Sequence, residues 1–274
     1  MKICLIYFSP TRNTAKIATI IKRALLKLGE SIEIFDITTY VKRNLLTKTI
    51  DLQNYTGIIF GFPIYAYRAP KVIREWLREI DGKGQKASIF FTYGGVSVGV
   101  AHKDTIRRLR QQNLFVVTTA EFLGEHSFNR AGWDLMENRP NRKDFKIAEK
   151  YAKITLERFR ENEKKFSIKI NSPQLEEEKL EKIEKRPKLV LSPPTFLEDC
   201  SLCGICEENC PVNAIDVKNT SISDPKCIRC LRCIQICPED ALKVKNIGKF
   251  LTALKKVEKL DKKTLNKKKS KIYL

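Results

Sequence analysis

The stretch KICLIYFSPTRNT at residues 2–14 decides the fold of the first half of the chain. Its apolar run, residues 2–8, has the composition of a buried strand, and the hydroxyl residues after it lead into a helical pattern at about 13–28. Backbone N–H groups and hydroxyls at the start of a helix form an anion site, which the helix dipole also favours. The stretch therefore predicts a strand, a phosphate-binding loop and a helix, in that order.

Arg12 departs from this pattern, because such loops usually have glycine at its position. If the φ angle of Arg12 is negative, the arginine costs little and its guanidinium can pair with a phosphate oxygen. If φ is positive, the strain is about 1–2 kcal/mol. A polar turn with a solvated arginine and no ligand is a third interpretation. We expect the loop to hold a phosphate.

Short apolar runs continue to alternate with helical patterns through the first half of the chain. The predicted strands are residues 2–8, 31–37, 57–62, 87–93 and 114–122, with helical patterns at about 13–28, 70–80, 98–112 and 143–165. Strands joined by crossover helices form parallel sheets. The predicted fold class is α/β, a doubly wound five-stranded parallel sheet of the flavodoxin-like order, followed by a small α+β domain. Residues 124–142 lack periodicity and are expected to form an excursion near the last strand.

Eight of the nine cysteines lie in two runs, CSLCGICEENCP at 200–211 and CIRCLRCIQICP at 227–238. Each run has the spacing C-x2-C-x2-C-x3-C-P, and the second repeats the first at an offset of 227 − 200 = 27 residues. This spacing lets three thiolates surround one face of an iron–sulfur cube, whereas zinc sites usually take ligands in two pairs. Disulfides are not expected, because the chain shows no export signal. The runs therefore predict iron–sulfur clusters.

The cysteine runs resemble those of bacterial two-cluster ferredoxins, in which the fourth cysteine of each run binds the other cluster. The resemblance implies two 4Fe-4S clusters. One would be bound by Cys200, Cys203, Cys206 and Cys237, and the other by Cys227, Cys230, Cys233 and Cys210.

The first half resembles a flavodoxin, and the chain as a whole resembles the flavodoxin–ferredoxin fusion proteins of anaerobic bacteria and archaea. The resemblance covers about 1–165 and 195–246. The expected parts are a flavodoxin-like FMN-binding domain at 1–165, a charged linker at 166–194, a ferredoxin domain with two 4Fe-4S clusters at 195–246 and a lysine-rich C-terminal extension at 247–274.

Three loops at the carboxyl ends of strands would bind the FMN. The first resembles the flavodoxin pattern S/T-x-T-G-x-T/S, the second has tyrosines that can flank a flat ring, and the third has paired glycines that let the backbone approach it. The implied contacts are Ser9, Thr11, Arg12, Asn13, Thr14, Pro63, Ile64, Tyr65, Ala66, Tyr67, Thr92, Tyr93, Gly94 and Gly95. No G-x-G-x-x-G follows the first strand, which favours a mononucleotide over a dinucleotide.

The expected function is that of an electron-transfer iron–sulfur flavoprotein, which passes electrons between FMN and two 4Fe-4S clusters. It would act as a carrier or as an oxidoreductase that reduces an unidentified acceptor, so its partners would be redox proteins or a small molecule. The alternative is a redox-sensing protein whose clusters control binding to an acidic partner or nucleic acid. A net charge of +20 fits that alternative, but a lysine-rich linker and tail explain the charge better.

The remaining signals are weaker. The start of the chain shows no cleavable signal and no apolar stretch is long enough to span a bilayer, so a cytoplasmic protein is expected. Cys4 is expected to be buried and inert. His102 and His126 have an ordinary surface interpretation, although His126 is a weak candidate for a residue beside the flavin. The apolar positions near 250–260 are expected to pack against the ferredoxin domain.

Overall fold

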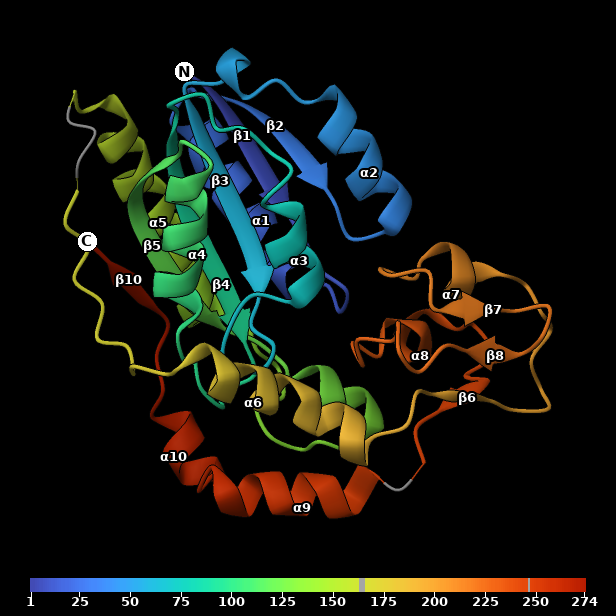
Figure 1. The fold of residues 1–274 in the computed structure, drawn as a ribbon. Helices are drawn as coiled ribbons and strands as arrows, with labels where there is room; N and C mark the ends of the chain where they lie inside the picture. The colour runs from blue at the N-terminus through green and yellow to red at the C-terminus, as the bar shows by residue number, and fades with distance from the viewer. Residues whose placement is uncertain (163–165, 246) are drawn as a thin grey trace.

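A parallel sheet with helices on both faces forms the larger lobe of the computed structural model, which describes residues 1–162, 166–245 and 247–274 (Figure 1). Its parallel strands are β1 (Lys2–Tyr7), β2 (Ser31–Asp36), β3 (Gly57–Pro63), β4 (Lys86–Tyr93) and β5 (Phe115–Leu123). The strand order is β10-β5-β4-β3-β1-β2, in which β10 (Lys271–Tyr273) is antiparallel to β5. The predicted five-stranded doubly wound sheet is confirmed, and the C-terminal extension adds a sixth strand to its edge.

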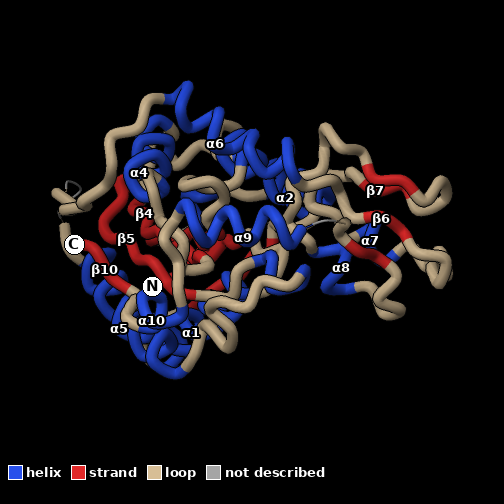
Figure 2. The backbone as a smooth tube through the Cα atoms, turned by 90° about the horizontal axis from the view of Figure 1, so that it is seen from below, coloured by secondary structure: helices blue, strands red, loops and turns tan. Residues whose placement is uncertain are grey.

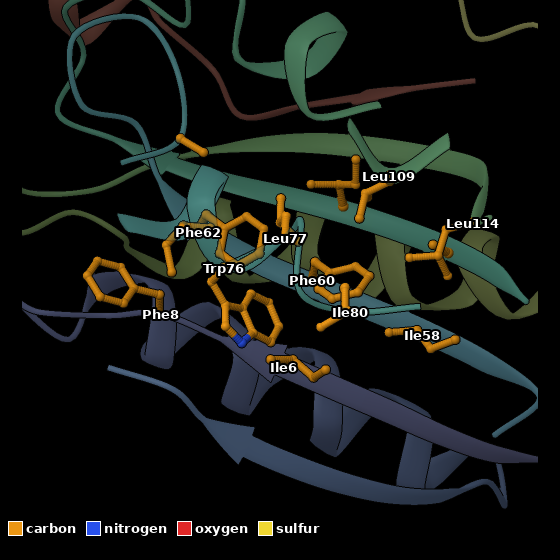
Figure 3. Close-up of a cluster of buried hydrophobic side chains, with 14 of the residues drawn as sticks. Ile6, Phe8, Ile58, Phe60, Phe62, Trp76, Leu77, Ile80, Leu109 and Leu114 are labelled. Atoms are coloured by element: carbon orange, nitrogen blue, oxygen red, sulfur yellow. The ribbon is translucent and has the colours of Figure 1, made fainter. Parts of the chain in front are cut away.

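The two faces of the sheet bury separate apolar clusters. Helices α1 (Asn13–Lys27) and α5 (Arg142–Arg160) cover one face, while α2 (Tyr40–Thr49), α3 (Lys71–Trp76) and α4 (Ala101–Gln111) cover the other. Figure 3 shows the second cluster, in which Trp76 packs against Phe60 and Phe62 of β3. Adjacent residues of β3 point to opposite faces, since Phe60 lies in this cluster and Ile59 lies in the other.

The smaller lobe contains the cysteine runs and two short antiparallel sheets. Its elements are β6 (Thr195–Phe196), α7 (Ile205–Glu208), β7 (Ile215–Asp216), β8 (Ser221–Ile222), α8 (Arg232–Ile236) and β9 (Leu242–Lys243). β6 pairs with β9, and β7 pairs with β8. The predicted small α+β domain is therefore present.

Two helices run across the carboxyl edge of the large sheet, α6 (Glu177–Val190) and α9 (Ile247–Val257), as Figures 1 and 2 show. α6 lies within the range expected to be a charged linker. After α9 the chain continues through α10 (Lys262–Asn266) to β10. Two short 3-10 helices complete the fold, η1 (Leu52–Asn54) and η2 (Ser127–Ala131). No helix in the described ranges has both the length and the apolar character to cross a membrane.

Candidate redox sites

A cavity of about 1040 Å³ lies at the carboxyl ends of β1, β3 and β4, where ligands bind in doubly wound folds. All three predicted FMN loops line it. The lining includes Ser9, Thr11, Asn13, Thr14, Pro63, Ile64, Tyr65, Ala66, Tyr67, Thr92, Tyr93 and Gly94. Arg12 and Gly95, the other two predicted contacts, are not part of the lining.

The first loop is held in shape by its own hydroxyls. Ser9 Oγ accepts a hydrogen bond from the backbone N–H of Ala15 at 3.0 Å, and the hydroxyl oxygens of Thr14 and Thr92 lie 2.7 Å apart. Asn13 donates its side-chain N–H to the carbonyl oxygen of Glu125 at 2.8 Å. Its Oδ1 atom is buried and has no hydrogen-bond partner among the described residues. That oxygen is an acceptor which a ribityl hydroxyl of FMN could satisfy, so the loop fits the cofactor.

Arg12 caps the start of α1 with a φ angle of 66°, and its side chain is exposed. This left-handed conformation favours glycine. Of the two alternatives for Arg12, the strained one with positive φ is therefore the one found. A contact between the guanidinium and a phosphate stays a prediction.

The second loop is a tight turn closed by reciprocal backbone hydrogen bonds between Tyr65 and Arg68, of 2.9 and 3.2 Å. Its central residues, Ala66 and Tyr67, have φ angles of 48° and 70°. Two successive left-handed residues that are not glycine carry strain, which is common where a loop must present side chains to a ligand. The turn places Tyr65 and Tyr67 in the wall of the cavity.

The third loop packs closely against His126. A Cβ atom on Gly94 would lie 2.5 Å from the His126 ring, so only glycine fits there. His126 Nδ1 accepts a hydrogen bond from the N–H of Phe128 at 3.2 Å, which leaves the proton on Nε2 when the ring is neutral. Burial lowers the pKa of His126 to about 4. The ring is therefore a neutral group in the cavity wall, beside the loop predicted to meet the flavin.

His102 does not lie on the surface as expected. It is only 1% exposed, and its ring nitrogens lie 2.7 Å from Thr119 Oγ1 and 3.3 Å from Glu121 Oε2. Tyr273 of β10 donates to the same carboxylate at 2.8 Å. Cys4 is fully buried, as expected, and burial raises the pKa of its thiol.

The sequence did not predict the cavity walls formed by α6 and α9. Phe250 and Leu254 of α9 line the cavity, and Tyr67 donates a hydrogen bond from its hydroxyl to Glu258. The apolar spacing of α9 was visible in the sequence, but its packing surface was not. α9 contacts the excursion after β5 through Phe128 and Phe250, whose ring centroids are 5.6 Å apart, as well as Leu231 of the small lobe. In addition to the expected packing against the ferredoxin domain, α9 therefore packs against the large lobe.

α6 is fixed to the second loop by buried arginines. Arg68 is 1% exposed and pairs with Glu177 and with Glu184, the latter at 2.9 Å. Arg74 donates to both carboxylate oxygens of Glu184, at 3.1 and 2.8 Å. Burial raises the pKa of Glu184, but the hydrogen bonds and charges of the two arginines outweigh it, so the pKa lies below its ordinary value. The acidic residues of α6 therefore close one side of the cavity.

The two cysteine runs adopt matching conformations. Positive φ angles recur at the 27-residue offset, as in Leu202 (58°) and Arg229 (56°). The backbone N–H groups of Ala214 and Ala241 each donate to a cysteine Sγ at 3.3 Å, to Cys210 and Cys237 respectively. Both fourth cysteines thus accept the same backbone hydrogen bond, which stabilises a thiolate.

The electrostatic neighbours of the cysteines follow the crossed pattern. Burial, together with smaller contributions from Cys200 and Cys237, raises the pKa of Cys206 to about 11. Burial likewise raises the pKa of Cys230 to about 12, with added contributions from Cys227 and Cys210. Each fourth cysteine therefore lies near cysteines of the other run. The donor set, thiols in two groups, suits iron–sulfur clusters.

The group containing Cys227, Cys230, Cys233 and Cys210, hereafter the inner set, faces the large lobe. Arg232 donates from Nη1 to the carbonyl oxygen of Pro10, in the phosphate loop, at 2.9 Å. Ile228 and Arg229 line the same cavity as the flavin loops. The outer set, which contains Cys200, Cys203, Cys206 and Cys237, includes the exposed Cys203.

Comparisons with known proteins agree with this architecture. Residues 26–127 match the family described as flavodoxin, and residues 196–238 match the family described as 4Fe-4S dicluster domain. The phosphate loop precedes the first match. A search of curated proteins finds no match.

Solved structures similar to the chain include a flavodoxin from the domain Archaea, at 16% identity and a TM-score of 0.43, over 59% of this chain and 100% of that one. Flavodoxin 1 from Bacillus cereus is similar at 20% identity and a TM-score of 0.42, over 57% and 98%. Rubredoxin oxygen:oxidoreductase from Desulfovibrio gigas is similar at 14% identity and a TM-score of 0.41, over 58% and 36%.

The strand order and the two family matches together define a flavodoxin domain followed by a 4Fe-4S dicluster domain. This is the arrangement of a flavodoxin–ferredoxin fusion, and both domain types serve electron transfer.

Proposed function

We propose that the protein is an electron-transfer flavoprotein that binds one FMN in the cavity and one 4Fe-4S cluster at each cysteine set. One observation carries the proposal: the inner set lies directly beside the flavin loops. Arg232, between two cysteines of that set, donates to the carbonyl of Pro10, and Ile228 and Arg229 share the cavity wall with Tyr65. Because both redox centres would be held in one chain, each would have a high effective concentration near the other.

FMN, when bound, exchanges one or two electrons, and a 4Fe-4S cluster exchanges one. The residues of the chain bind and shield these groups. The start of α1 would provide backbone N–H groups for the phosphate, and Tyr65 and Tyr67, which line the cavity, would flank the ring. The backbone at Gly94, which packs against the neutral His126, would lie near the edge of the ring. Residues of helices α6 and α9 form the remaining wall beside these loops.

The outer set is the side at which a redox partner would dock. Cys203 is exposed, and so are its neighbours Leu202 and Ile205, at 51% and 37%. The inner set faces the large lobe and has two buried cysteines, Cys210 and Cys230, whereas the outer set has one, Cys206. An electron would therefore pass between the partner and the outer set, then the inner set, then the cavity. The protein acts as a carrier or as a reductase of an acceptor, inside the cell, where thiol ligands remain reduced.

Cofactor analysis of anaerobically purified protein tests the proposal. We expect about eight iron atoms and one FMN for each chain. Cys237→Ala should lose the outer cluster, and so about half of the iron. Cys4→Ala is the matched control, because Cys4 lies in the sheet away from both sets, and it should retain all of the iron. Stoichiometric zinc in place of iron, or FAD in place of FMN, would contradict the proposal.

A further inference from the structure

Tyr65 has a buried hydroxyl that lacks a partner. Its ring lines the cavity, but the hydroxyl oxygen is inaccessible and makes no hydrogen bond among the described residues. Leaving a buried hydroxyl unsatisfied costs about 1–3 kcal/mol, so native structures rarely do so without another group present. The loop that carries Tyr65 is held firmly, by the bonds across its turn and by the buried Arg68. Tyr65 is therefore directed toward a group that the polypeptide itself does not provide.

The surroundings of the hydroxyl identify that group. Ile64, the residue before Tyr65, packs against the apolar cluster that contains Leu231, the residue after Cys230. Cys230 belongs to the inner set, and Ile228 and Arg229, just before it in sequence, share the cavity wall with Tyr65. Tyr67 differs, because its hydroxyl donates a hydrogen bond to Glu258, the residue after α9. Among the described residues, Tyr65 is thus the cavity tyrosine whose hydroxyl is both buried and unpaired.

We propose that the Tyr65 hydroxyl donates a hydrogen bond to a sulfur of the cluster bound by the inner set, and so favours reduction of that cluster. The inference rests on the proposed function. A donor aimed at sulfur stabilises the reduced cluster more than the oxidised one, because reduction adds a negative charge. One electron enters, no covalent bond forms or breaks, and the hydroxyl keeps its proton. Tyr65 is thus a positioning residue that connects the wall of the flavin site to the inner cluster.

Tyr65→Phe removes the hydroxyl and keeps the ring, and Tyr67→Phe is the matched control. Both are made in the Cys237→Ala background, in which the inner cluster should be the remaining one. Anaerobic redox titration with dithionite then reports the cluster by electron paramagnetic resonance and the flavin by visible absorbance. With Tyr65→Phe we expect the cluster to be reduced about tenfold less readily at a given potential, which is about 59 mV for one electron. Tyr67→Phe should leave the cluster unchanged.

The outcomes separate this inference from the proposed function. A parent protein without an iron–sulfur signal would refute the proposed function before any tyrosine variant is compared. A normal parent with an unchanged cluster potential in Tyr65→Phe would overturn the role of Tyr65 alone. A shift of the flavin potential without one of the cluster would also overturn it, since the hydroxyl would then serve the flavin. Iron content equal to that of the background variant shows that Tyr65→Phe still folds.

Discussion

The positive φ angle of Arg12 should affect the stability of the protein. Its φ of 66° is strained for arginine, and its exposed side chain makes no capping hydrogen bond at α1. Arg12→Gly removes the strain but adds freedom to the unfolded chain, and Arg12→Ala keeps the strain. We expect the glycine variant to be more stable than the alanine variant by about 0.5–1 kcal/mol. Denaturant unfolding of the two variants measures this, and a more stable alanine variant would contradict the left-handed geometry.

The arginine side chain is tested separately, by ligand binding. If the guanidinium reaches the phosphate, Arg12→Ala should weaken FMN binding roughly tenfold to a hundredfold, because a charge-assisted hydrogen bond contributes about 1.5–3 kcal/mol. Riboflavin, which has no phosphate, should bind as before. Lys16→Ala is the control, since it removes the same charge from an exposed position in the next turn of α1. Equal FMN affinities for Arg12→Ala and the parent would exclude the contact.

His126 should make the unfolding free energy depend on pH. Its pKa is lowered from 6.5 to about 4 by burial, so the unfolded chain binds a proton there at pH values where the folded chain does not. The stabilisation is complete above about pH 6.5 and is lost as the pH falls toward 4. His126→Asn can retain the cap on η2 without titrating. Its unfolding free energy should therefore fall less steeply between pH 6.5 and 4.5 than that of the parent, and identical slopes would show that the ring is solvated.

At the scale of elements, α6 depends on its ion pairs. Glu184 joins Arg68 and Arg74, and Glu184→Gln would leave two buried guanidinium groups with a weaker partner. A broken buried pair costs about 3–5 kcal/mol, but Glu184 is 23% exposed, so we expect about 1–2 kcal/mol and faster proteolysis within α6. Glu181→Gln, which disturbs only an exposed pair with Lys185, should cost less than about 0.5 kcal/mol. Equal proteolysis of the two variants would show that α6 is held by other contacts.

The elements also show what the sequence could and could not predict. The apolar runs of β1, β3, β4 and β5 are buried along their lengths, so local composition was enough to find them. α2 was missed because it buries only Arg43 and Leu46 and has no strong apolar face. β10 has three residues in a lysine-rich segment, and its conformation comes from pairing with β5. In this pairing Lys271 lies opposite Glu121, and Tyr273 lies opposite Thr119. Such pairing is a tertiary contact that no local pattern encodes.

For the molecule as a whole, the cysteine spacing and the three loops predicted two kinds of redox site but not how they face each other. The contact between Arg232 and Pro10 joins residues that are far apart in the sequence, in two lobes. The part of the cavity wall that α6 and α9 form likewise depends on how a charged linker and a lysine-rich tail pack. The composition of the linker predicts a solvated segment. The apolar positions of the tail predict packing, but they do not identify all of the surfaces on which the tail packs.

An anaerobic reductive titration tests the central claim most directly, that one chain carries a flavin and two clusters which exchange electrons. Dithionite is added in measured amounts while flavin and iron–sulfur absorbance are followed. The account predicts about four electrons for each chain, two taken up by the FMN and one by each cluster. Uptake of about two electrons, with no change in iron–sulfur absorbance, would contradict it.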